Sequence, residues 1–269
     1  MAVRKSRFAE RGVSESIGFI LIFSIIIAGI GLVTLYGYPM LMQQQTNANE
    51  RIMEKNMIVL QNDIKSLAYK TVPYKETSLK VEGGPLVIYN TSSTSPTATF
   101  RIFDDNGNEY VTDYTPGDLR YESVDAQTDI SLQNGAVLKY QQSGSAMLAE
   151  PRWFHDTTTN TWVINLIAIN SSGYNMVAKT GICTVRMALG DHTEYIYSDT
   201  IPAGTKILID YTPDTTTDFS TAWDNYFQNV LETGPPTFSG LARRYELPSD
   251  ASRPTRLVIK KYEVMIQSL

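Results

Sequence analysis

The sequence predicts an α+β protein: a long N-terminal transmembrane helix that extends outside the membrane and packs on a β-rich head, built as an antiparallel sandwich or a large sheet. Residues 17–42 form an uncharged apolar run, residues 53–67 continue a helical apolar pattern, and β-type segments fill the chain from residue 78 onward. We therefore divide the chain into a basic N-terminal segment (1–12), a transmembrane helix (13–42), an amphipathic helix (43–72) and a β-rich domain (73–269) with one helix near 218–232.

The apolar run is long enough to cross a membrane. A hydrocarbon core of about 30 Å requires about 20 apolar residues in a helix. The hydrophobic part of a cleaved secretory signal is shorter, about 7–15 residues. A buried core helix is the other alternative, but uninterrupted apolar runs of about 18 residues or more favour a membrane span. The sequence thus predicts one span near the N-terminus.

Charge predicts the orientation of this span. Four basic residues precede it and two acidic residues oppose them: Arg4, Lys5, Arg7 and Arg11 against Glu10 and Glu15. The first charges after the span, Glu50 and Arg51, cancel. Because Lys- and Arg-rich flanks stay in the cytoplasm, we expect a single-pass protein of the cell membrane with a cytoplasmic N-terminus and an extracytoplasmic C-terminal domain.

The amino-acid composition limits the kinds of partner that the protein can be expected to bind. The chain has 23 basic and 28 acidic residues, a net charge of −5, and no long basic run. This pattern argues against nucleic acid as a partner. The single cysteine, Cys183, cannot form an internal disulfide, so the head must rely on its apolar core. We expect Cys183 to be a buried strand residue, with a reactive thiol as the alternative.

The second half of the helix is amphipathic. Its apolar residues recur at spacings of four and three, which places them on one stripe of a helix: Met53, Met57, Leu60, Ile64 and Leu67. Pro73 ends the pattern, and Pro39 is expected to kink or soften the helix because proline removes a backbone hydrogen bond. The same stripe is compatible with a monomeric anchored protein in which the helix only covers a sheet.

The remainder of the chain reads as short antiparallel strands joined by turns. Asn106-Gly107 lies between two such strands and predicts a two-residue hairpin. Many strands at close spacing are typical of a sandwich or a large sheet. The one helical segment begins near Asp218, a favourable capping residue, and is closed by Pro235-Pro236.

No motif predicts chemistry. Residues 104–109 resemble a calcium loop only in part, because the glycine and the final carboxylate fall at the wrong positions, and a hairpin is favoured. His155 and His192 read as exposed turn residues. Since no motif for catalysis or ligand binding is present, we expect no catalytic residues, no cofactor, no metal site and no enzyme activity. Asn90 and Asn170 each begin an Asn-x-Ser/Thr sequence and are candidate N-glycosylation sites of a glycoprotein.

The N-terminus resembles a known family. Basic residues, then Arg11-Gly12, then VSESIGFILIF form an arrangement similar to the class III signal peptide of archaeal type IV pilin-like proteins. The segment from Asn134 to Asn170 is similar to uncharacterised archaeal pilin-like membrane proteins, in which a strand, an "ML-x-EP" strand and a hairpin follow one another. The resemblance implies that a prepilin peptidase cuts between Gly12 and Val13, and an uncleaved signal anchor is the alternative.

The resemblance also implies assembly through the helix. Glu15 would be the third mature residue, whereas bacterial pilins place the corresponding carboxylate fifth. Small residues let membrane helices approach one another, and the span has several: Gly18, Ser24, Ala28, Gly29 and Gly31. We expect these to face like or related pilin subunits, with membrane lipid as the other partner.

The expected function is that of a structural subunit, minor or tip, of an archaeal type IV pilus-like surface filament, with adhesion as a role of its head. The alternative is a monomeric single-span surface protein that binds a ligand or a surface through its β head. A surface hydrolase is a third hypothesis, and it would require clustered carboxylates in a cleft of the head.

Overall fold

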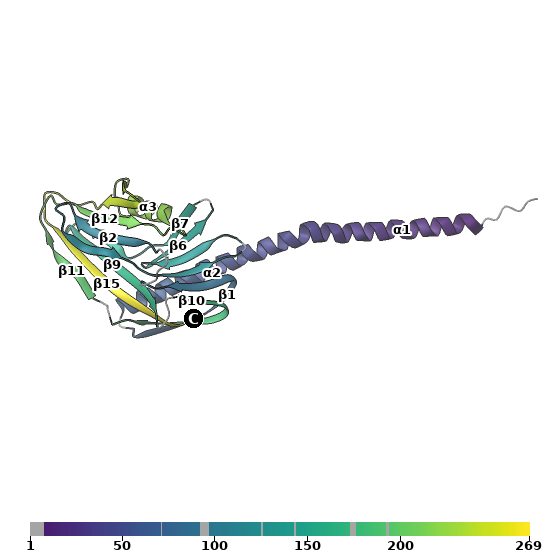
Figure 1. Ribbon diagram of the computed structural model, residues 1–269, viewed down its shortest axis with the longest axis horizontal. Coiled ribbons are helices and arrows are strands. Elements are labelled where there is room, and N and C mark those ends of the chain that lie inside the picture. Colours follow the sequence, from purple (N-terminus) through teal and green to yellow (C-terminus); the bar gives the residue numbers. More distant parts are fainter. Residues whose placement is uncertain are drawn as a thin grey trace, which may run out of the picture. The chain divides into compact units, whose positions relative to one another are not determined.

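A computed structural model describes residues 8–70, 72–91, 97–124, 126–142, 144–172, 176–191 and 194–269. The chain divides after Ala48 into an N-terminal unit and a larger unit, residues 49–269, which we call the head. An N-terminal apolar helix followed by a β-rich head is the α+β class that the sequence predicts (Figure 1).

The N-terminal unit is helical throughout its described part. It consists of α1 (Phe8–Leu32), the π-helical segment η1 (Val33–Gly37) and the first turns of α2 (Tyr38–Tyr69). The amide of Tyr38 donates to the carbonyl of Val33, five residues earlier. Pro39 has no amide hydrogen and its ring crowds the carbonyl four residues before it. A wider π turn next to Pro39 accommodates that ring, so the softening expected at Pro39 takes this local form.

α2 ends at Tyr69, three residues before the predicted boundary, and its later turns belong to the head. The apolar stripe predicted from the sequence is confirmed, because Met53, Met57, Leu60, Ile64 and Leu67 are all buried. Two polar residues share the buried side, Glu50 and Gln61, and both have partners in the head.

The head contains two sheets in its described residues. The larger sheet has ten strands in the order β7-β6-β5-β4-β1-β10-β15-β9-β8, with β11 paired to the first half of β15 beside β10. Its strands are β1 (Tyr74–Tyr89), β4 (Asp118–Glu122), β5 (Asp129–Gln133), β6 (Ala136–Gln141), β7 (Gly144–Ala149), β8 (Trp153–Asp156), β9 (Thr161–Ser171), β10 (Met176–Leu189), β11 (Glu194–Ile201) and β15 (Thr255–Ser268).

The smaller sheet has five strands in the order β13-β14-β12-β2-β3. These are β2 (Thr99–Asp104), β3 (Glu109–Tyr114), β12 (Ile207–Thr212), β13 (Thr237–Ser239) and β14 (Ala242–Glu246). The single helix expected near 218–232 is α3 (Ser220–Asn229), and the carboxylate of Asp218 accepts the backbone N–H of Ser220 at 2.7 Å.

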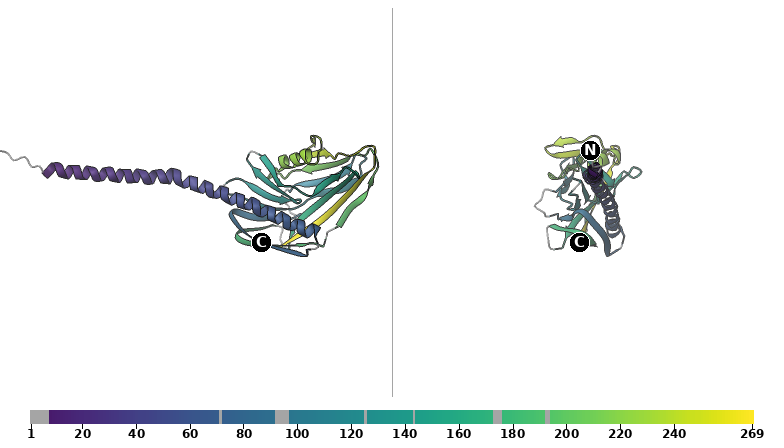
Figure 2. Two further views of the ribbon diagram at one scale, coloured as in Figure 1. Left: turned by 180° about the vertical axis from the view of Figure 1, so that it is seen from behind. Right: turned by 90° about the vertical axis from the view of Figure 1, so that its right-hand side faces the viewer.

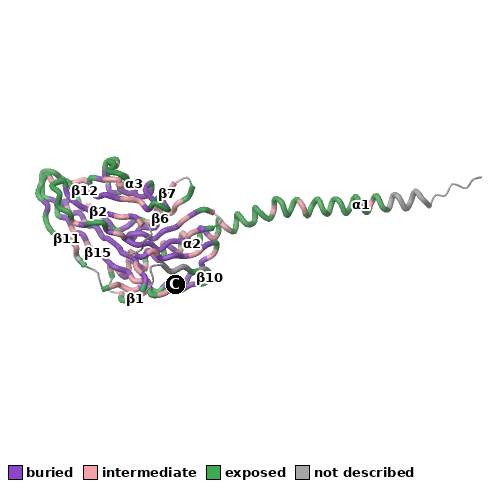
Figure 3. The backbone as a smooth tube through the Cα atoms, viewed as in Figure 1, coloured by how far each residue is buried: buried purple, intermediate pink, exposed green. Residues whose placement is uncertain are grey.

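The larger sheet has a core on each face. On one face α2 crosses the strands (Figure 2) and its stripe packs against residues such as Ile167 and Ile169 of β9. On the other face, α3 and the smaller sheet pack against the alternate residues of β9, including Trp162 and Ile164. Because successive strand residues point to opposite faces, β9 contributes to both cores. Figure 3 shows this buried interior in purple.

The sheet is not purely antiparallel, which corrects the sequence-based expectation. β9 and β15 run parallel, with Arg256 opposite Thr161 and Ile266 opposite Ser171. Parallel strands cannot be joined by a tight turn and need a long crossover. Here the connection between β9 and β15 includes the interior strand β10, the strand β11, part of the smaller sheet and α3.

The two Asn-Gly pairs of the chain form different turns. The prediction of a two-residue turn at Asn106-Gly107 is wrong, although this pair does join two strands of a hairpin. Asn106-Gly107 lies in a four-residue connection between β2 and β3, and only Gly107 has positive φ. The two-residue turn with positive φ at both positions is instead Asn134-Gly135, between β5 and β6. This turn is buried: the Asn134 side-chain oxygen accepts the N–H of Ile167, and the Gly135 carbonyl accepts from Gln61.

Candidate functional site

The most unusual surface of the described chain is the apolar helix at residues 17–42. Every large apolar side chain in this range is exposed, from 40 % for Met42 to 72 % for Tyr36. Figure 3 shows the same stretch in green. A soluble protein rarely leaves so large a contiguous apolar surface in water. The helix is long and apolar enough to cross a bilayer, so it is a candidate membrane anchor.

The small residues of this helix fall on two strips rather than one. A regular helix advances about 100° per residue, so Ser24, Ala28 and Gly31 lie within about 60° of one another. Gly18 and Gly29 share a second strip, about a third of a turn away. A side chain added at Gly18, Gly29 or Gly31 would meet nothing within 4 Å. These positions therefore leave the backbone open to an approaching helix.

Two hydroxyl side chains within the candidate anchor are satisfied locally. The hydroxyl of Ser24 donates to the carbonyl of Ile20 at 2.7 Å, and that of Thr34 donates to the carbonyl of Ile30 at 2.9 Å. Both bonds stay within one turn, so neither hydroxyl needs a partner from outside the helix. Ser24 and Thr34 therefore present no unsatisfied donor to lipid, whereas the hydroxyls of Tyr36 and Tyr38, near the C-terminal end of the run, are exposed.

The predicted cleavage site lies at the edge of what can be described. Gly12, Val13 and Glu15 fall within the helical backbone of α1, and their side chains lie outside the described residues. Glu15 is one of the candidate assembly residues, and its role stays a prediction.

Each of the two candidate glycosylation asparagines forms hydrogen bonds with the residue that follows the other in the sequence. The side-chain oxygen of Asn90 accepts the N–H and the hydroxyl of Ser171 at 2.8 and 3.1 Å. The side-chain oxygen of Asn170 accepts the N–H and the hydroxyl of Thr91 at 3.0 and 2.9 Å. This reciprocal clamp ties the end of β1 to the end of β9.

The clamp makes the two sites unequal as glycan acceptors. Asn90 is buried, with 5 % of its surface exposed, which leaves little room for a sugar on the folded chain. Asn170 is half-buried, and its amide nitrogen donates to the carboxylate of Glu263 at 2.7 Å. A glycosylated amide keeps one N–H, so this bond could persist. Glycosylation stays a prediction at both positions, and the geometry favours Asn170.

The residues considered for chemistry are placed as follows. Cys183 is a buried, unpaired strand residue of β10, as predicted. His155 is not an exposed turn residue: it lies in β8 and stacks on the ring of Trp162 at 4.6 Å. His192 lies outside the described residues. Within the described ranges, no group of three or more His, Cys, Asp or Glu side chains is arranged to hold a metal ion.

The calcium-like segment is a hairpin closed by its own carboxylate. One oxygen of Asp104 accepts the N–H groups of Asn106 and Asn108 at 3.0 and 2.8 Å, and the other accepts the Asn108 amide and the Tyr110 hydroxyl. Burial opposes the charge of Asp104, but these hydrogen bonds outweigh it and lower the pKa of the carboxyl. The lone pairs that would bind calcium are already occupied.

Comparison with known proteins yields one match. Residues 11–234 match the model of a family of unknown function (DUF7289). The chain belongs to this family. No curated protein and no solved structure matches it. The family match spans the candidate anchor, α2 and most of the head, so the combination of the helix with the β domain is a property of the family rather than of this chain alone.

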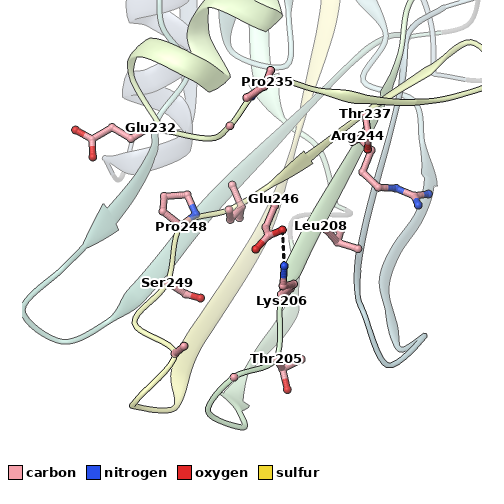
Figure 4. A pocket seen from close by; sticks show the side chains of 14 residues that line it. Thr205, Lys206, Leu208, Glu232, Pro235, Thr237, Arg244, Glu246, Pro248 and Ser249 are labelled. Carbon is pink, nitrogen blue, oxygen red and sulfur yellow. Dashed lines mark hydrogen bonds and ion pairs between the residues drawn. The ribbon is translucent and has the colours of Figure 1, made fainter.

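The head of this family member has several surface clefts. The cleft in Figure 4, about 480 Å³, lies between the loop before β12 and the segments that follow α3 and β14. Its two cations are paired: Lys206 pairs with Glu246 at 2.9 Å, and Arg244 forms two bonds to Asp210 at 2.7 and 2.8 Å. Glu232 also lines the cleft and forms no ion pair in the described part of the chain. Cations that are already paired have little need of an anionic ligand.

Proposed function

We propose that this protein is a pilin-like structural subunit, minor or tip, of an archaeal type IV pilus-like surface filament, anchored and assembled through its N-terminal helix. The observation that carries the proposal is the helix at residues 17–42, which is uncharged and exposed on all sides. The head has its own cores and does not use this helix. A separately folded domain attached to a long apolar helix suits a subunit that is first held in lipid and then packed among other helices.

Physical chemistry explains why such a helix would both anchor and assemble. Lipid chains are as apolar as Leu or Ile side chains, so moving a helix from lipid into a bundle gains no hydrophobic free energy. Association must come from close backbone packing at small residues. Ser24, Ala28 and Gly31 supply one such strip, and the absence of charge from residues 17–42 keeps the transfer from stranding an ion.

The charge pattern and the N-terminal sequence support the remaining parts of the proposal. The basic segment would stay in the cytoplasm and the head would lie outside the cell. A prepilin peptidase would cut between Gly12 and Val13. The head would provide lateral contacts and adhesion, with Asn170 as the more accessible glycan acceptor.

Mass spectrometry of the intact protein from native membranes tests the processing step. A mature chain that begins at Val13 supports a pilin-like route. A chain that keeps the residue 1–12 segment would favour the alternative, a monomeric surface protein with an uncleaved anchor.

Cysteine cross-linking in native membranes tests the assembly step. The natural Cys183 is buried, so a new thiol in the helix would be the reactive one. We expect Ala28→Cys to form disulfide-linked pairs on mild oxidation. The matched control is Ile26→Cys. Ile26 lies about 3 Å from Ala28 along the helix axis, toward the N-terminus, and on the opposite side of the helix. Equal cross-linking of both variants, or none, would contradict assembly through the strip at Ala28.

A further inference from the structure

A second cleft of the head, about 660 Å³, lies at the C-terminal end of α2. The last turns of α2 form one wall, and the end of β7 with the segment that leads to β8 forms the other. Its lining includes Lys65, Tyr69 and Lys70 on the first wall and Glu150 and Arg152 on the second. This volume is within the range of about 300–1,000 Å³ that is typical of ligand pockets.

The cleft is basic, although the protein is acidic. Three cations, Lys65, Lys70 and Arg152, face one carboxylate, Glu150, so the lining carries a net charge of +2 in a chain whose net charge is −5. None of the three cations forms an ion pair with a carboxylate in the described part of the chain. The cleft in Figure 4 differs in this respect, because its Lys206 and Arg244 are both paired.

The cationic groups are held in place by neutral contacts. The ammonium of Lys65 donates to the backbone carbonyl of Glu150 at 3.1 Å, and the same carbonyl accepts from Gln61 at 2.9 Å. The guanidinium of Arg152 lies over the ring of Tyr69, 4.7 Å from its centroid. Stacking fixes the plane of the guanidinium while its N–H groups remain available at the edge. Two positive donors are therefore oriented before any ligand arrives.

The partial burial of Lys65 also favours the binding of an anion. Burial lowers the pKa of Lys65, the Glu150 charge opposes that change, and the Arg152 charge reinforces it. A nearby anion would relieve both the desolvation and the repulsion between the two cations. Cations near a helix C-terminus also stabilise the helix dipole, which explains Lys70, the residue directly after α2. It does not explain Arg152, which comes from the opposite wall.

Part of the cleft lining is apolar. Met147, Leu148, Ala149 and Pro151 contribute to the lining beside the ring of Tyr69. A small inorganic anion would leave this surface uncovered. A ligand with one acidic group and a short apolar body would satisfy both parts of the cleft.

We propose that this cleft binds a carboxylate attached to an apolar body, with Arg152 and Lys65 as the anion-binding residues. Such a group has two sources, a free organic acid or an acidic side chain of a second copy of this chain. The second source rests on the proposed assembly function, whereas the first does not.

Calorimetric titration of the full-length protein in neutral detergent tests the site with hexanoate as the probe and hexanamide as its uncharged counterpart. We expect hexanoate to bind once per chain with a Kd of about 1 mM, as suits a ligand of this size, and hexanamide to bind at least about tenfold more weakly. Arg152→Gln and Lys65→Gln should each weaken hexanoate binding about tenfold, the ratio expected for one charge-assisted hydrogen bond. Lys80→Gln, which removes an equally charged but exposed residue outside the cleft, should leave the affinity unchanged.

A second arm identifies the source. Sedimentation of the same detergent samples measures self-association with and without 20 mM hexanoate. Association that Arg152→Gln weakens and hexanoate suppresses assigns the site to a neighbour's carboxylate. One-to-one hexanoate binding by a monomeric particle assigns it to a free acid and leaves the proposed assembly untouched. Absence of hexanoate binding, or an equal loss in Lys80→Gln, overturns the site, provided that tryptophan fluorescence shows folded variants.

Discussion

Residues 17–42 and residues 49–69 are both helical and lie on one continuous helical stretch, yet their side chains follow opposite rules. The first range is apolar on every side and exposed throughout. The second has one buried apolar stripe, and apart from the buried Glu50 its charged residues lie off that stripe. Because both ranges are helical, helix formation alone does not indicate whether a range lies in lipid, in water or against the head. The distribution of apolar residues around the helix does indicate this.

The difference also appears in the placement of charge. No formal charge occurs in residues 17–42, and the first acidic residue of the head, Glu50, is buried beside Lys139. A charge in the first range would have to be carried into lipid. A charge in the second needs only a partner in the head. The comparison therefore makes predictions about which substitutions each range tolerates.

The largest effect is expected from charges placed in the first range. Ile22→Asp with Ile26→Asp puts two carboxylates near the middle of the candidate anchor. Each should cost about 2.5–3.5 kcal/mol of insertion free energy, or about 5–7 kcal/mol together. We expect the double variant to be lost from the membrane fraction on carbonate extraction.

The control places the same two charges in the second range. Ile52→Asp with Val59→Asp alters side chains that are 49 % and 47 % exposed, off the buried stripe. Their membrane partition should equal that of the natural protein. If the Ile22/Ile26 variant also stays membrane-bound, residues 17–42 are not the anchor.

The next largest effect is expected in the buried stripe. Leu60→Ala removes a fully buried side chain and should destabilise the head by about 2–5 kcal/mol. Ile20→Ala in the first range should leave the unfolding of the head unchanged. Urea unfolding followed by tryptophan fluorescence is selective, because Trp153, Trp162 and Trp223 are all buried in the head. Val59→Ala is the matched control, since this neighbour of Leu60 is exposed.

Equal losses for Leu60→Ala and Val59→Ala would mean that α2 does not cover the sheet. A loss for Ile20→Ala of the same size as that for Leu60→Ala would mean that the two ranges are not energetically separate.

A smaller effect is expected from the polar contact of the second range. Gln61 is 2 % exposed, and its amide donates to the carbonyls of Gly135 and Glu150 at 2.7 and 2.9 Å. Gln61→Ala leaves the buried Gly135 carbonyl without this donor and should cost about 1–3 kcal/mol in the same unfolding assay. The exposed Lys55→Ala should change stability by less than about 0.5 kcal/mol. A loss no larger than that of Lys55→Ala would show that the buried turn does not depend on Gln61.

The parts of the fold that sequence predicted are those with local causes. The stripe from Met53 to Leu67 repeats within a few residues, so its burial follows from helix geometry. The apolar run of 17–42 is likewise a local property. Most strands are apparent for the same reason, but β5 of the larger sheet and β13 and β14 of the smaller sheet are short and carry too few β-branched residues in alternation to stand out.

The Asn-Gly pairs show where local signals fail. Both have the composition of a tight hairpin turn, but Asp104 lies two residues before Asn106 and takes up the N–H groups of Asn106 and Asn108. That side chain competes with the turn and widens the loop. Asn134-Gly135 has no such competitor, and the N–H of Ile167 fixes its asparagine instead. The conformation of the Asn106-Gly107 loop therefore depends on a neighbouring side chain, and that of the Asn134-Gly135 turn on a distant backbone group.

The parallel pairing of β9 with β15 and the basic cleft were not predictable. Each joins segments about 80 residues apart or more, and neither segment carries a signal for the other. Lys65 reads as one charge on the polar side of a helix, and Arg152 as one charge in a turn. Their proximity depends on how α2 lies across the sheet.

The smallest effect is expected from the ion pair at the start of the second range. Lys139 pairs with Glu54 at 2.8 Å and with Glu50 at 3.3 Å. Burial lowers the pKa of the ammonium, but its bonds to the two carboxylates outweigh burial and raise the pKa above its usual 10.5. A raised lysine pKa stabilises the fold below the unfolded value of about 10.4, and this contribution disappears as pH rises through the folded value.

We therefore expect Lys139→Gln to cost about 1 kcal/mol at pH 7 and to cost progressively less as the pH rises above the unfolded value and through the raised folded value, because the natural protein loses the same interaction there. Unfolding at pH 7, 9 and 11 measures this convergence. Lys206→Gln, which breaks an exposed pair with Glu246, should cost less at every pH. Parallel stability curves for the natural protein and Lys139→Gln across this range would show that Glu50 does not need its cation, and the contrast in charge placement between the two helical ranges would lose its energetic basis.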